Sequence, residues 1–201
     1  VYIICRISSL ALLLLLVPML SFTKEILIIW LKEPPEYAVE FVVFLLITLF
    51  VSVLGSGFDS CIQSTGKIRN NEVVYALVCL IQLPIMYVAY ILGAPPFFNA
   101  ILLCLSTLLQ KLYQIYLLGR LTSFNYIDYI KDTLSPVLVT FVISLGPLLL
   151  IKHVFSFTIV GSLILVIIYE IWIVFSIYLF GLKRTEREQI IGFLNARIKK
   201  Q

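Results

Sequence analysis

The 201-residue chain is 61% hydrophobic and only 13% charged, with a formal net charge of +4. Soluble domains carry about a quarter charged residues, so this composition predicts an integral membrane protein and excludes a disordered tail, a coiled coil and a disulfide framework. At roughly 20 apolar residues per helical crossing, the length allows six or seven spans and leaves no room for a soluble enzyme domain.

Charge-free apolar runs predict six transmembrane helices. The longest run, 73–110, would reach about 57 Å as a single helix, nearly two bilayer cores, so it must fold back on itself. Gly93-Ala94-Pro95-Pro96 lies near its middle and predicts the break, because proline lacks an amide donor and disfavours helix in the preceding residue. The predicted spans are residues 7–22, 38–57, 72–92, 97–118, 134–151 and 157–181.

Three segments between and after the spans predict helices that lie along the membrane surface. Residues 23–31 are too apolar for a free loop, and Trp30 suits the aromatic belt of the outer interface. Residues 123–132 mix aromatic and polar side chains and should lie in the cytoplasmic interface. Residues 185–200 predict a cytoplasmic amphipathic helix, whose apolar face would carry Ile190, Ile191, Leu194 and Ile198.

The distribution of lysine and arginine predicts the orientation. With six spans, both termini lie on one side, and that side collects eleven basic residues against three on the other, with Lys111 left inside a span. The positive-inside rule therefore places both ends in the cytoplasm. Basic residues on cytoplasmic loops face anionic lipid, so the net charge predicts a lipid bilayer and no nucleic acid as partner.

One polar stripe inside the predicted membrane region is the main functional signal. Lys111 lies in the fourth span, and Thr107, Gln110, Lys111 and Gln114 recur at helical spacing on one side of it. Such a stripe faces protein or a water-filled cavity, which makes these four residues candidate substrate-binding groups. The alternative is that Lys111 snorkels to the lipid headgroups.

A second ionisable group, Glu170, lies in the middle of the last span. Ionisable residues within membrane spans are costly and mark ion or proton pathways. Glu170 is therefore a candidate ion-coupling residue, and a structural hydrogen bond is the equally weighted alternative.

No catalytic or metal-binding constellation is present in the sequence. There is no glycine-rich phosphate loop, serine elbow, HExxH or CxxC motif, and Ser64-Thr65-Gly66-Lys67 lacks the upstream glycine of a phosphate-binding loop. His153 falls in a short outer turn, where an interfacial role is expected. We therefore expect no enzyme activity, no metal and no cofactor.

Several loop motifs together resemble the bacterial polysaccharide-repeat-unit flippases, which export O-antigen or exopolysaccharide units and belong to the multidrug, oligosaccharidyl-lipid and polysaccharide transporter superfamily. The motifs are, in order, Glu33-Pro34-Pro35-Glu36-Tyr37-Ala38, Ile62-Gln63-Ser64-Thr65-Gly66-Lys67-Ile68-Arg69-Asn70, Leu92-Gly93-Ala94-Pro95-Pro96, and Phe180-Gly181-Leu182 leading into Glu186-Arg187.

The resemblance implies the C-terminal part of a fourteen-helix fold in the bacterial cytoplasmic membrane. Residues 1–118 would form four spans of the second transporter lobe, and residues 119–201 two appended spans and the tail. An N-terminal transporter half would be a partner, and the start at Val1 instead of a methionine is then expected of a remainder. Polysaccharide polymerase machinery would be a further partner.

The implied function is the flipping of an undecaprenyl-pyrophosphate-linked oligosaccharide by alternating access, driven by an ion gradient. Lys111 would attract the pyrophosphate, while Gln110 and Gln114 would bind sugar hydroxyls. Three alternatives remain open: a drug or cation antiporter of the same fold, a membrane-embedded transferase that uses lipid-linked sugars, and a fragment that transports nothing.

Overall fold

The computed structural model describes residues 1–154 and 159–182. Within these ranges every regular element is helical, as the composition predicts. The predicted amphipathic helix 185–200 lies outside the described residues. The elements are α1 (Tyr2–Ser21), α2 (Thr23–Leu31), α3 (Ala38–Leu54), α4 (Phe58–Ser64), α5 (Arg69–Ile91), α6 (Phe98–Leu121), α7 (Tyr126–Tyr129), the π-helix η1 (Ile130–Leu134), α8 (Ser135–Val154), α9 (Ile159–Ser176) and the π-helix η2 (Ile177–Gly181).

In the part of the chain that the structure describes, five helical stretches are long and apolar enough to cross a membrane, which confirms the coarse prediction of a helical membrane protein. They are Tyr2–Ser21, Ala38–Ser64, Arg69–Ile91, Phe98–Leu121 and Tyr126–Leu148. The last predicted span corresponds to α9 and η2, where the described apolar stretch Leu165–Gly181 is shorter. The count of six spans stays a prediction.

The break inside the longest apolar run lies where the sequence predicts it. Helix α5 ends at Ile91 and α6 begins at Phe98. Gly93 between them has a φ of +85°, a left-handed conformation that glycine adopts without steric cost. The two helices then pack against each other as an antiparallel hairpin.

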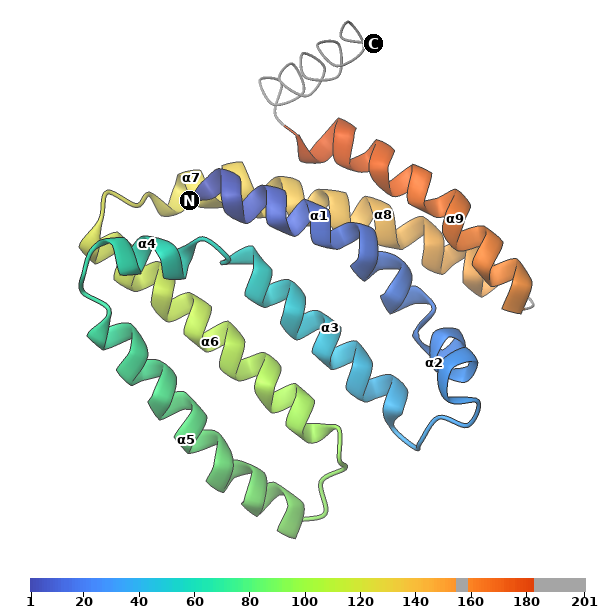
Figure 1. Cartoon of the computed structure of the whole chain (residues 1–201), viewed down its shortest axis with the longest axis horizontal. Helices are drawn as coiled ribbons and strands as arrows, with labels where there is room; N and C mark the ends of the chain where they lie inside the picture. The colour runs from blue at the N-terminus through green and yellow to red at the C-terminus, as the bar shows by residue number, and fades with distance from the viewer. Residues whose placement is uncertain (155–158, 183–201) are drawn as a thin grey trace, which may run out of the picture.

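Helix α3 occupies the centre of the molecule (Figure 1). It packs against α1 on one side and α6 on the other, and α5 lies beyond α6 at the edge. Helix α1 also packs against α8 and α9, so it joins the two predicted groups of spans. The chain start, α4 and α7 lie at one end of the bundle, whereas α2 and the turn between α5 and α6 lie at the other.

Segment 123–132 differs in part from the expected surface helix. Only Tyr126–Tyr129 forms α7, which continues through η1 into α8. Tyr129 is buried, and its ring lies 5.3 Å from that of Phe58 on α4. The ring of Tyr129 therefore packs against other aromatic rings of the protein and does not lie at the membrane surface. Ile127 on the same turn is exposed, as an interfacial residue should be.

Candidate functional site: a polar groove between α3, α5 and α6

A cavity of about 390 Å³ lies between α3, α5 and α6, with α4 at one end. We call it the polar groove. Its lining residues are Ser52, Asp59, Asn71, Glu72, Tyr75, Val78, Cys79, Gln82, Leu103, Ser106, Thr107, Gln110 and Lys111. Most of them are polar, although the helices that carry them expose large apolar side chains elsewhere.

Two local features of the chain build this groove. The α5–α6 hairpin places the polar side of α6 opposite Asn71, Glu72 and Gln82 of α5. The chain also breaks after α3, so α4 lies against α6 and brings Asp59 to the end of the groove.

Gly55 is needed at that break because of a close approach. A Cβ atom at this position would lie 2.7 Å from a ring carbon of Phe58 and 2.8 Å from Cδ of Lys111. Both distances are shorter than real Cβ atoms show. The absence of a side chain at Gly55 therefore lets Lys111 cross over the end of α3.

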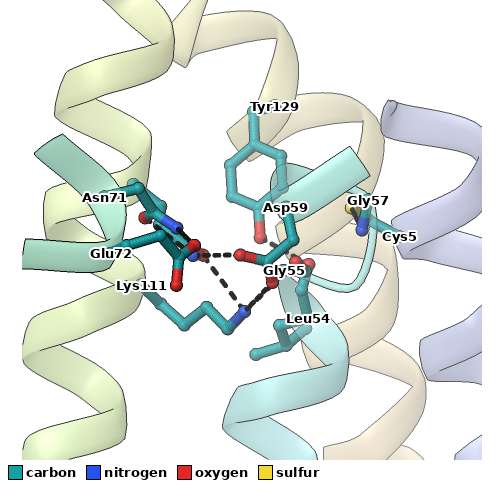
Figure 2. Close-up of polar contacts among 10 residues, drawn as sticks. Cys5, Leu54, Gly55, Gly57, Asp59, Asn71, Glu72, Lys111 and Tyr129 are labelled. Atoms are coloured by element: carbon teal, nitrogen blue, oxygen red, sulfur yellow. Dashed lines mark hydrogen bonds and ion pairs between the residues drawn. The ribbon is translucent and has the colours of Figure 1, made fainter. Parts of the chain in front are cut away.

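The ammonium group of Lys111 contacts other groups of the protein. Its side chain is 12% exposed, and Nζ lies 3.4 Å from Oδ2 of Asp59. Nζ also donates to the carbonyl oxygen of Gly55 at 3.4 Å and to Oε1 of Gln114 at 3.1 Å. Lys111 thereby connects α6 to both α3 and α4 (Figure 2).

Gln114 is fully buried and links the charged residues of the groove. Its Oε1 accepts from Lys111, while its Nε2 donates to Oδ1 of Asp59 and, at 3.2 Å, to Oδ1 of Asn71. Asn71 in turn donates from Nδ2 to Oε1 of Glu72 at 3.1 Å. Both donor hydrogens of the amide and one of the two lone pairs of its oxygen are thus used.

The break between α3 and α4 is held by two further helices. The hydroxyl of Tyr129 donates to the carbonyl oxygen of Leu54 at 3.0 Å. The backbone amide of Gly57 donates to Sγ of Cys5 at 3.3 Å. Figure 2 shows these contacts beside the Lys111 network. Side chains from α1, α6 and the α7 turn therefore satisfy main-chain groups that the end of α3 leaves open.

The structure brings the four predicted substrate-binding residues to one region. Thr107, Gln110 and Lys111 line the groove, and Gln114 lies buried beside it. The hydroxyl of Thr107 donates to the carbonyl of Leu103 in its own helix. Gln110 carries no hydrogen bond to another described side chain, so its amide is available to a ligand.

Glu170 lies elsewhere. It sits on α9, which packs against α1 and α8 and contributes no lining residue to the groove. Its side chain is half-buried. Among the residues whose side chains the structure describes, none forms a hydrogen bond or ion pair with its carboxylate.

Most residues that line the groove were not among the predicted site residues, and three of the missed ones belong to its hydrogen-bonded network: Asp59, Asn71 and Glu72. Asp59 and Asn71 lie in the stretch that the sequence assigns to a cytoplasmic loop, and Glu72 is the first residue of the predicted span 72–92, at a membrane boundary where polar residues need no explanation. The contact between Asp59 and Lys111 joins residues 52 positions apart, so only the folded chain reveals it. The Gly55-Ser56-Gly57 sequence before Asp59 is the one local signal of a break.

Comparisons of the chain with protein-family models, with curated proteins and with solved structures find no match.

Proposed function

We propose that the chain is part of a transporter that flips a lipid-linked oligosaccharide across the bacterial cytoplasmic membrane by alternating access. The observation that carries this proposal is the polar groove itself. Polar and charged side chains within a membrane bundle are costly and mark substrate pathways. A groove on the side of such a bundle can hold a polar head while the attached lipid tail stays in the bilayer.

The surface of α5 supports a further transporter lobe as partner. Large apolar side chains on this helix are exposed, among them Leu80, Leu83 and Ile91. Its principal contacts are with α6, so much of its surface is left for another body or for lipid. An N-terminal lobe packed there would close the groove into a cavity. Polysaccharide polymerase machinery is a second proposed partner, and both termini are proposed to be cytoplasmic.

Each groove residue has a proposed role in this transporter. Gln110 and Thr107 bind sugar hydroxyls, which suits an amide and a hydroxyl. Lys111 and Gln114 hold α6 against α3 and α4 through their contacts with Gly55 and Asp59, which keeps the groove in shape. Glu170, which lies outside the groove, is the proposed residue for coupling to an ion gradient.

A cation antiporter is the second candidate, and a specific observation favours it. Such a carrier needs carboxylates in its cavity, and the groove contains two, Asp59 and Glu72. This candidate predicts that the protein moves cationic dyes in exchange for ions and that Asp59→Asn stops this movement.

Transport by the purified protein in proteoliposomes tests the proposal. We expect Lys111→Ala to lower the rate of flipping of a fluorescent lipid-linked oligosaccharide at least about ten-fold, because it removes the ammonium that joins three helices at the groove. Lys24→Ala removes an exposed charge on α2 and should leave the rate unchanged.

Two outcomes would reject the flippase proposal. One is an unchanged flipping rate in Lys111→Ala protein that folds and reconstitutes normally. The other is dye transport without any flipping of the lipid-linked oligosaccharide, which would instead support the antiporter.

A further inference from the structure

We propose that the polar groove selects its sugar by charge: it accepts neutral and amine-bearing sugars and disfavours acidic ones, and Glu72 sets this preference. The inference rests on the proposed function, because it names the substrate class of the same groove. It follows from which groups of the groove are already engaged and which remain available.

The positive charge of the groove is engaged by the protein. A lysine ammonium has three donor hydrogens. Nζ of Lys111 has three protein acceptors around it, the Asp59 carboxylate, the Gly55 carbonyl and the Gln114 amide oxygen. An acidic sugar would therefore have to displace a protein acceptor before it could pair with this ammonium.

The charges that remain are negative. The charged residues lining the groove are the carboxylates of Asp59 and Glu72 and the ammonium of Lys111, two negative charges and one positive, which leaves one net negative charge. Asp59 is paired with Lys111 and also accepts from Gln114. Glu72 carries the excess charge.

Glu72 is placed to meet a ligand. Its side chain is exposed, and among the described residues its contact is with the amide of the buried Asn71, which donates to Oε1. This contact fixes one oxygen of the carboxylate and leaves Oε2 as an acceptor. Figure 2 shows Glu72 beside Asn71, on the side of the groove that faces Lys111 and Asp59.

The other available groups suit a sugar. Gln110 on α6 offers both an amide donor and an acceptor, and Tyr75 on α5 also lines the groove and carries a ring and a hydroxyl. Sugar hydroxyls donate well to a carboxylate, and an ammonium group on the sugar adds an ion pair. A sugar carboxylate instead meets the repulsion of Glu72.

Binding of three sugars of similar shape and different charge tests the proposal. The full chain is placed in nanodiscs of phosphatidylcholine, and glucosamine, glucose and glucuronate are titrated by saturation-transfer NMR. We expect glucosamine to bind about ten-fold more tightly than glucuronate, with glucose between them. The difference should shrink at high salt, because the groove is open to solvent and its charge is screened.

Matched variants assign the preference to Glu72. Glu72→Gln should bring the three affinities to within about two-fold of one another, and Glu72→Asp should restore part of the difference. Glu33→Gln removes an exposed carboxylate between α2 and α3 and should change nothing. Methylammonium is included as a cation without a sugar ring, and it should bind more weakly than glucose.

The outcomes separate this inference from the proposed function. Tighter binding of glucuronate, equal binding of all three sugars, no binding of any of them, or an unchanged preference in Glu72→Gln would overturn the inference. Methylammonium binding as tightly as glucosamine would also overturn it, since the groove would then recognise only the cation. The predicted order of binding without flipping in proteoliposomes would reject transport and retain the selectivity.

Discussion

The position of Lys111 can be predicted from the sequence, but its contacts cannot. Its position in a polar stripe of an apolar span is visible in the sequence, because Thr107, Gln110 and Gln114 share its helical face. Its partners are not visible there, since Asp59 and Gly55 come from a segment more than 50 residues earlier. The same contacts turn an expected free cation into one that is engaged by protein acceptors.

Gly55 provides a prediction about stability at the same place. Gly55→Ala should destabilise the protein by about 1–3 kcal/mol, because the added methyl must push away Phe58 or Lys111. The midpoint of thermal unfolding in detergent measures this effect. The added methyl should also displace the Lys111 side chain from the Gly55 carbonyl, and we expect the same sample to bind sugar more weakly.

Gly146→Ala is the matched control for that substitution. Gly146 lies within α8, and a Cβ atom there has no neighbour within 4 Å. The change to alanine should be neutral or stabilise by about 0.5–1 kcal/mol, since glycine is unfavourable inside a helix. Equal midpoints for the two variants would contradict the close packing at Gly55.

At the scale of elements, the junction between α3 and α4 decides the shape of the groove. Leu54, Gly55 and Gly57 each use a main-chain group to bind a side chain from another helix. These contacts fix the direction of α4 and hence the position of Asp59. The geometry of the junction therefore depends on tertiary contacts with three other helices.

Tyr129→Phe tests this junction. The variant loses the hydrogen bond to the Leu54 carbonyl, which contributes about 0.5–1.5 kcal/mol, and should raise amide hydrogen exchange in residues 54–60. Tyr87→Phe alters an exposed ring on α5, 70% exposed, and should leave exchange at the junction unchanged. The same exchange in both variants would show that the hydroxyl does not hold the junction.

Which elements were predictable depends on how local their causes are. The α5–α6 hairpin follows from Gly93 and the two prolines after it, and α2 follows from an apolar segment before Pro34, so both were predicted. The packing of α4 against α6 and the burial of Tyr129 depend on contacts between distant helices, and neither was predicted. Asp59 in a predicted loop and Glu72 at the start of a predicted span were therefore not recognised as site residues until the fold placed them in the groove.

At the scale of the whole molecule, apolar packing and polar lining lie on opposite sides of α3. One buried apolar cluster joins α1, α3, α8 and α9, with Leu13, Val137 and Ile173 fully buried. The polar groove lies on the other side, against α5 and α6. The first side can serve as a rigid support, while the second offers the hydrogen-bonding groups that a polar substrate needs.

The most direct test of the account is cross-linking of a lipid-linked oligosaccharide to the groove. A photoreactive phenylalanine derivative replaces Gln110 on the groove wall or, as a control, the exposed Leu150 on α8. We predict light-dependent cross-links to the glycan from position 110 and none from position 150, and competition by unlabelled substrate. Equal labelling at both positions, or none at position 110, would contradict the claim that the polar groove is the substrate site.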